Sequence, residues 1–118
     1  NTISVTGDGS SGTPYELSIV NLQKTIDTNI TLTNADNFYT IFINNSSTPL
    51  TITVPSTLTD NFCCAFYQLG SADVEFIEGS GTTILATVGN KIKGQNYSVV
   101  LEKILNTAEY LLTNATKV

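Results

Sequence analysis

Few residues of this chain could take part in chemistry, and the most suggestive of them are two carboxylates. Asp73 and Glu75 lie two positions apart in a segment with strand-like alternation, so both side chains would point to one face. Paired carboxylates can hydrolyse glycosidic bonds or bind a hard cation. No further oxygen-rich loop adjoins them in the sequence. We therefore expect Asp73 and Glu75 to form a solvated strand edge or a surface contact, and we expect no metal site.

Nucleophilic and zinc chemistry lack their usual side chains. The chain has no histidine, so neither a Ser–His nor a Cys–His pair can form within it. Its two cysteines, Cys63 and Cys64, are adjacent, which suits neither zinc ligation nor an unstrained disulfide. We expect two free, mostly buried thiols, with one exposed thiol at a subunit contact as the alternative. We predict no catalytic or cofactor-binding residues, no cofactor and no enzymatic activity.

A glycine-rich segment at residues 7–12 matches the pattern G-x-G-x-x-G. A dinucleotide site requires a helix to begin there, so that the helix N-terminus meets the pyrophosphate. The residues that follow, from Thr13 to Leu17, instead continue into a strand pattern. The segment therefore predicts a hairpin loop.

Composition narrows the choice of partners. Ten acidic residues stand against five lysines, with a net charge of −5, whereas nucleic-acid-binding domains are basic. We expect no nucleic-acid partner and no membrane insertion. The 19 threonines, 12 asparagines and 10 serines indicate an extracellular or virion-like exterior. Because the sequence contains no methionine, we also expect it to be a piece of a longer protein.

Alternation of apolar and polar residues recurs through most of the chain and predicts short strands separated by turns. Residues 22–28 lack this pattern, and there we expect a short helix or an irregular connection. It would divide an N-terminal β-arm, residues 1–22, from a domain at 23–118. Short strands with frequent turns favour a sandwich, so we predict an all-β, jelly-roll-like antiparallel β-sandwich. The expected strands are 3–6, 15–20, 29–33, 38–44, 50–54, 62–69, 74–77, 83–86, 97–104 and 109–113, with a further short one at 91–93.

Several of these strands are apolar on both faces, although a lone two-layer sandwich needs only one apolar face per strand. The side chains left over by the main apolar pattern indicate a second burial partner, which could be another chain or a covering loop of the same chain. We predict that they form an oligomer interface. The residues concerned are Phe42, Ala65, Tyr67 and Val100.

Four segments in the same order resemble a domain of bacteriophage tail-fibre, head-fibre and appendage proteins. They are LTNADNFYTI (32–41), LTITVP (50–55), NFCCAFYQLG (61–70) running on to VEF (74–76), and YSVVLEK (97–103) with EYLL (109–112). The opening VTGDGSSGTPY (5–15) is similar to one found in phage structural proteins. The likeness covers residues 32–113 and consists of strand patterns, which carry no functional residues. It departs from the family at Tyr110, where such domains often have Trp.

The resemblance implies a homotrimeric domain on the virion surface. It would hang from the capsid or tail, contact other virion proteins, and mediate attachment to the host surface or its glycans. The alternative function is a carbohydrate-binding module from a larger secreted or virion-associated hydrolase. A stable trimer favours the first, whereas glycan binding by a monomer favours the second.

Overall fold

The computed structural model describes residues 2–20 and 22–118, giving only the backbone for 2–4 and 16–20. The chain is all-β, and its one described helix is a single 3-10 turn, η1 (Asn34–Asp36). An N-terminal hairpin pairs β1 (Thr2–Thr6) with β2 (Glu16–Val20) in antiparallel register. No described helix is long and apolar enough to cross a membrane.

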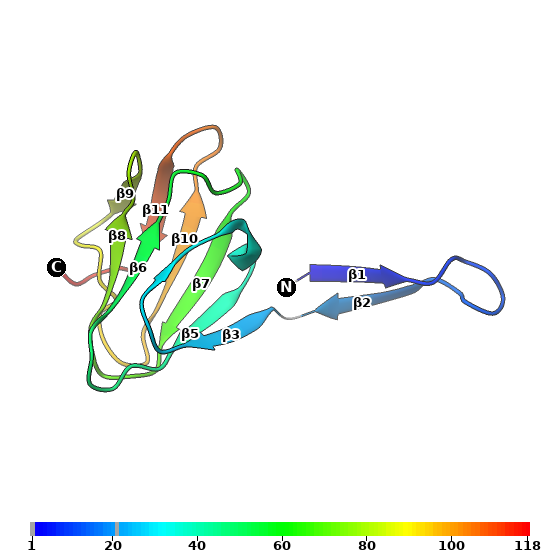
Figure 1. Ribbon diagram of the computed structural model, residues 1–118, viewed down its shortest axis with the longest axis horizontal. Helices are drawn as coiled ribbons and strands as arrows, with labels where there is room; N and C mark the ends of the chain where they lie inside the picture. The colour runs from blue at the N-terminus through cyan, green and yellow to red at the C-terminus, as the bar shows by residue number, and fades with distance from the viewer. Residues whose placement is uncertain (1, 21) are drawn as a thin grey trace.

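The body of the protein is a short β-solenoid of three coils, each of which gives one strand to each of two facing sheets (Figure 1). The first coil holds β3 (Gln23–Ile26) and β4 (Ile30–Thr31). The second holds β5 (Thr40–Ile43) and β6 (Leu50–Val54). The third holds β7 (Cys63–Gln68) and β8 (Val74–Glu78).

Equivalent strands of successive coils are parallel. β3, β5 and β7 pair side by side in one sheet, and β4, β6 and β8 form the other. The remaining strands then extend the first sheet beyond β7, as β10 (Ser98–Lys103), β11 (Glu109–Thr113) and β9 (Thr83–Ala86). β10 is antiparallel to β7 and to β11, whereas β9 is parallel to β11.

This architecture corrects the prediction of an antiparallel, jelly-roll-like β-sandwich, although the all-β content was right. Alternation of apolar residues shows which face a strand buries, but it is the same for parallel and antiparallel neighbours. The short turn at 44–49 leads from β5 into β6, yet these strands belong to different sheets and do not pair. The turn at 69–73 separates β7 from β8 in the same way. Each turn was therefore a corner of a coil.

Residues 22–28 were also wrongly predicted, because β3 occupies most of them. β3 has one half-buried face and one exposed face. Its Lys24 forms an ion pair with Asp36 of η1, and Ile26 packs against the core. The strand pattern was missed because Lys24, a charged residue, stands at an inward position where alternation predicts an apolar one.

The core lies between the two sheets. Ile41 and Phe66 come from the large sheet, Ile52 and Phe76 come from the small one, and all four are buried. The rings of Phe66 and Phe76 meet edge to face, with centroids 4.9 Å apart. The two sheets are thus joined by apolar packing across a single layer.

The two ends of the solenoid differ. At the third coil, β10 covers the free edge of β7, and Lys91 forms a bridge with Glu75 of β8. At the first coil, β3 and β4 pair with β5 and β6 on one side, and no described strand pairs with them on the other. Only the C-terminal end is therefore capped within the described part of the chain.

Candidate functional site

The four side chains predicted to form an interface lie together on the outer face of the large sheet, away from the core. Phe42 of β5 is in register with Tyr67 of β7, and their ring centroids are 5.6 Å apart. Ala65 of β7 is in register with Val100 of β10. We call these four residues the outer patch.

A second apolar pair, which was not predicted from the sequence, lies on this face. Leu111 of β11 is in register with Leu85 of β9, and their exposed fractions are 46% and 40%. The signal was present in the sequence, because Leu111 alternates in register with the polar residues Glu109 and Thr113. Its face could have been assigned from that alternation alone.

No described strand covers this outer face, because the small sheet packs on the opposite side (Figure 1). Tyr67 is 40% exposed, and the other members of the outer patch are half-buried. Residues in register across neighbouring strands form rows on this face. The row of Phe42 and Tyr67 ends in polar residues, with Thr25 of β3 on one side and Ser98 of β10 on the other. The face thus has an apolar centre and a polar border.

The two thiols point in opposite directions and are both free. Cys64 faces the core, and its thiol donates to the carbonyl oxygen of Tyr39 at 3.2 Å. Burial raises the Cys64 pKa to about 12. Cys63 is only half-buried and is in register with Glu102 on the outer face. Burial and then the charge of Glu102 raise its pKa. The expectation of mostly buried thiols was right for Cys64 and only partly right for Cys63.

Asp73 and Glu75 are engaged by lysines. Lys117 donates to Asp73 at 2.6 Å, and this hydrogen bond is the main cause that lowers the Asp73 pKa. Lys91 lies between the two carboxylates, 3.5 Å from Asp73 and 3.9 Å from Glu75. The four side chains form a charge-balanced cluster that holds the C-terminal segment beside β8.

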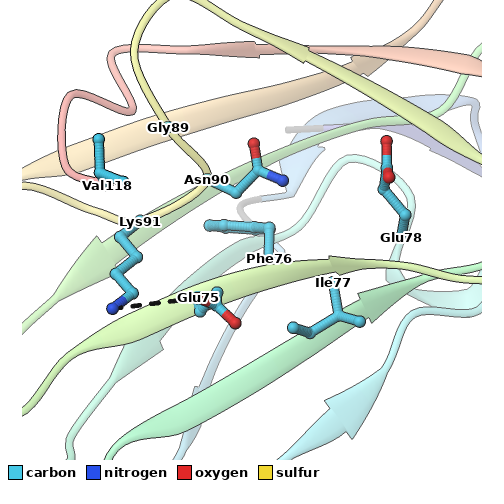
Figure 2. Close-up of a pocket in the computed structure, with 8 residues that line it drawn as sticks. All are labelled: Glu75, Phe76, Ile77, Glu78, Gly89, Asn90, Lys91 and Val118. Carbon is cyan, nitrogen blue, oxygen red and sulfur yellow. Dashed lines mark ion pairs between the residues drawn. The ribbon is translucent and has the colours of Figure 1, made fainter.

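Glu75 and Lys91 also border an open hollow of about 540 Å³, together with Phe76 and Glu78 (Figure 2). The Glu78 carboxylate accepts a hydrogen bond from the backbone of Ile84 at 2.7 Å, which fixes the start of β9. Both carboxylates at this hollow therefore interact within the protein, Glu75 with Lys91 and Glu78 with the backbone of Ile84. Among the described residues, no group of three or more His, Cys, Asp or Glu side chains could hold a metal.

The glycine-rich segment at residues 7–12 forms the turn between β1 and β2, as predicted. Gly7 and Gly9 have φ values of 85° and 84°, which favour glycine. The Asp8 carboxylate accepts from Ser10 N at 2.9 Å and from the Thr13 hydroxyl. These bonds, that of Thr13 first, lower the Asp8 pKa to about 2. The polar groups of this turn therefore satisfy one another.

Tyr110, the position that departs from the resembled family, is fully buried. Its hydroxyl donates to the carbonyl oxygen of Pro55 at 2.9 Å. Burial raises its pKa. The residue therefore supports the packing between β11 and the segment after β6, and it forms no part of the surface.

Comparisons with family models, curated proteins and solved structures give no match to this chain. The resemblance to phage fibre domains therefore stays a prediction that rests on the four sequence segments.

Proposed function

We propose that this chain is a non-catalytic structural domain of a bacteriophage fibre or appendage. It assembles with two further copies of itself through the outer patch. The resemblance over residues 32–113 supports the virion setting. The uncovered apolar centre of the large sheet is the observation that carries the proposed assembly.

A sheet whose second face meets water normally presents polar residues there. Here Phe42 and Tyr67 form an aromatic pair on that face. Leu85 and Leu111 form a second apolar pair on β9 and β11, and Glu102 of β10 lies between Leu111 and β7. Burying one large apolar side chain contributes roughly 1.5–3 kcal/mol. Contact between copies at this face would therefore stabilise an assembly.

Threefold symmetry suits this face and a fibre. A cyclic trimer closes on itself and leaves no unpaired copy of the interface. With the large sheets turned toward the axis, the small sheets would face outward, where Thr51 and Thr53 lie on the half-exposed side of β6. Glu75 and Ile77 of β8 lie beside these threonines on the same face. This mixed surface is the part that would meet the host surface or its glycans.

The test is the mass of the purified chain in solution, measured by sedimentation equilibrium. We expect the wild-type chain to be a trimer and Phe42→Asp to be a monomer with an unchanged β-type circular dichroism spectrum. Thr53→Asp is the matched control, because it adds the same charge to the other sheet, and it should remain trimeric.

A wild-type chain that stays monomeric at the highest concentration tested would contradict the proposed assembly. If Phe42→Asp unfolds, Tyr67→Ser replaces it, since Tyr67 is the most exposed of the four patch residues. A folded Tyr67→Ser variant with undiminished trimer affinity would also count against this interface.

A further inference from the structure

A second hollow, of about 340 Å³, lies where β10 begins and β11 ends. It is separate from the acidic hollow of Figure 2 and shares no residue with it. We call it the tyrosine hollow. Its lining residues are Lys93, Asn96, Tyr97, Ser98, Asn114 and Thr116.

Tyr97 gives this hollow an accessible aromatic surface. Its side chain is 49% exposed, and the Lys93 ammonium lies 5.1 Å from the ring centroid. The backbone beneath is held in place, because Asn96 N donates to Gln68 O at 2.6 Å and Tyr97 N donates to Gly94 O at 3.2 Å. The ring is therefore presented to solvent from an anchored turn.

The asparagines of the hollow differ from those of the solenoid coils. In the coils, Asn29, Asn34 and Asn37 each accept a hydrogen bond from a backbone N–H of another segment. The exposed amides of Asn96 and Asn114 make no hydrogen bond to any described residue. Each keeps an acceptor and two donors available to a ligand.

We propose that the tyrosine hollow binds one pyranose ring of a saccharide. The apolar face of the sugar would pack on the face of the Tyr97 ring that Lys93 does not cover. Asn96 and Asn114 would form hydrogen bonds with its hydroxyl groups, and Lys93 would bind a further hydroxyl or the carboxylate of an acidic sugar. The volume lies within the usual range for small-ligand sites of about 300–1,000 Å³. This inference deepens the attachment role and rests on the proposed function for its biological setting.

The chemistry favours a sugar over a phosphate-bearing ligand. Among the described residues, Lys93 is the single cation that lines the hollow, and the whole chain has no arginine and a net charge of −5. Phosphate sites typically rely on arginine forks or on several cationic and backbone donors. An aromatic ring with neighbouring amides instead fits a ligand that has an apolar face and many hydroxyl groups.

The test is a nuclear magnetic resonance titration of the ¹⁵N-labelled full chain with glucose, N-acetylglucosamine and glucuronate, each in turn. We expect at least one of these sugars to shift the amide signals of Asn96, Tyr97 and Asn114. Tyr97→Ala should weaken that binding by about tenfold. Tyr15→Ala is the control, because Tyr15 is a tyrosine even more exposed than Tyr97, at 69% against 49%, and it does not line the tyrosine hollow; this variant should bind as the wild type does.

Asn114→Gly gives a second, milder variant. Asn114 has a φ of 70°, which glycine adopts without strain, so the substitution removes the amide and keeps the backbone. It should weaken binding without changing the stability by much.

Two results would overturn the saccharide site: no shift with any of the three sugars, or equal binding by the wild type and Tyr97→Ala. Sedimentation of the same samples separates this proposal from the trimer. A monomer that binds sugar at Tyr97 would defeat the proposed assembly alone and favour a carbohydrate-binding module. A trimer without sugar-induced shifts would defeat the saccharide site alone.

Discussion

The backbone of Gly70 lies so close to that of Asn45 that a Cβ on Gly70 would stand 2.1 Å from the Asn45 carbonyl oxygen. The contact joins the turn after β7 to the turn after β5, which stack one on the other. The amide of Asn45 reinforces it by donating to Ala72 O at 3.1 Å, and Ala72 N returns a bond to Asn45 O at 3.0 Å. The stack of coils is therefore held at its corners as well as by its sheets.

Replacing Gly70 by alanine should destabilise the fold. The added methyl group would collide with backbone atoms of Asn45, which cannot rotate away. Overpacking of this kind typically costs about 1–3 kcal/mol, and we expect Gly70→Ala to reach the upper end of that range in urea denaturation. Gly94→Ala is the control, because a Cβ there has no neighbour within 4 Å. Equal stabilities for the two variants would contradict the close approach.

The two cysteines should react with a thiol reagent at different rates in the folded protein. Cys64 is buried and its pKa is raised to about 12, so almost no thiolate forms at neutral pH. Cys63 is half-buried and should react first. Alkylation followed by peptide mass spectrometry distinguishes the two sites, and unfolding in urea should bring both to similar rates. Faster labelling of Cys64 than of Cys63 in the folded, monomeric Phe42→Asp variant would show that the assigned faces of β7 are reversed.

Assembly through the outer patch should protect Cys63, because it lies on the same face. Cys63 should therefore be alkylated faster in the Phe42→Asp variant than in the wild type. Labelling at Cys64 should not change. Equal Cys63 rates in a wild-type trimer and a monomeric Phe42→Asp variant would place the interface elsewhere.

Acid should loosen the C-terminal segment. The hydrogen bond from Lys117 holds the Asp73 pKa below its ordinary value, so the folded state binds this proton less readily than the unfolded state. The resulting stabilisation is complete above the unfolded carboxyl pKa of about 3.9 and is lost as the pH falls through the lower folded value. The contribution is small because the Asp73 side chain is 36% exposed, and solvent screens its ion pairs.

Hydrogen exchange at the amide of Lys91 reports this change, since that amide donates to Lys117 O at 3.1 Å. We expect its protection to fall with acid in the wild type. In Asp73→Asn, protection should already be reduced at neutral pH and should respond less to acid. Acid-insensitive protection of this amide in the wild type would contradict the role given to Asp73.

The sequence was enough to predict which side chains are buried on most strands. Ile41 and Ile43 alternate with Thr40 and Phe42 in β5, and burial follows that alternation. The outer patch could be found in the same way, as the apolar residues of the opposite register. Such local periodicity depends only on the geometry of a single strand.

The pairing of the strands could not be derived in this way. β5 pairs with β3 and β7, which are distant in sequence, and not with β6, which follows it directly. The recurrence of strand, corner and strand was the available signal for a solenoid. It was obscured because the coils differ in length and the first contains only the two-residue β4. The tyrosine hollow was equally hidden, since Tyr97 and Asn114 come together only through the pairing of β10 with β11.

No described strand pairs with the outer edges of β3 and β4, so the length of the protein could be changed at its first coil. The two strands of a further coil inserted before β3 could pair in parallel with β3 in one sheet and with β4 in the other. The coil would lengthen the body by about 4.8 Å, the spacing of neighbouring strands. The same insertion would add one strand to the edge of the large sheet, beside β3, and would leave β9, β10 and β11 unchanged. Duplication of one coil could therefore change the length of the domain in fixed increments, while the sequences at its two ends stay the same.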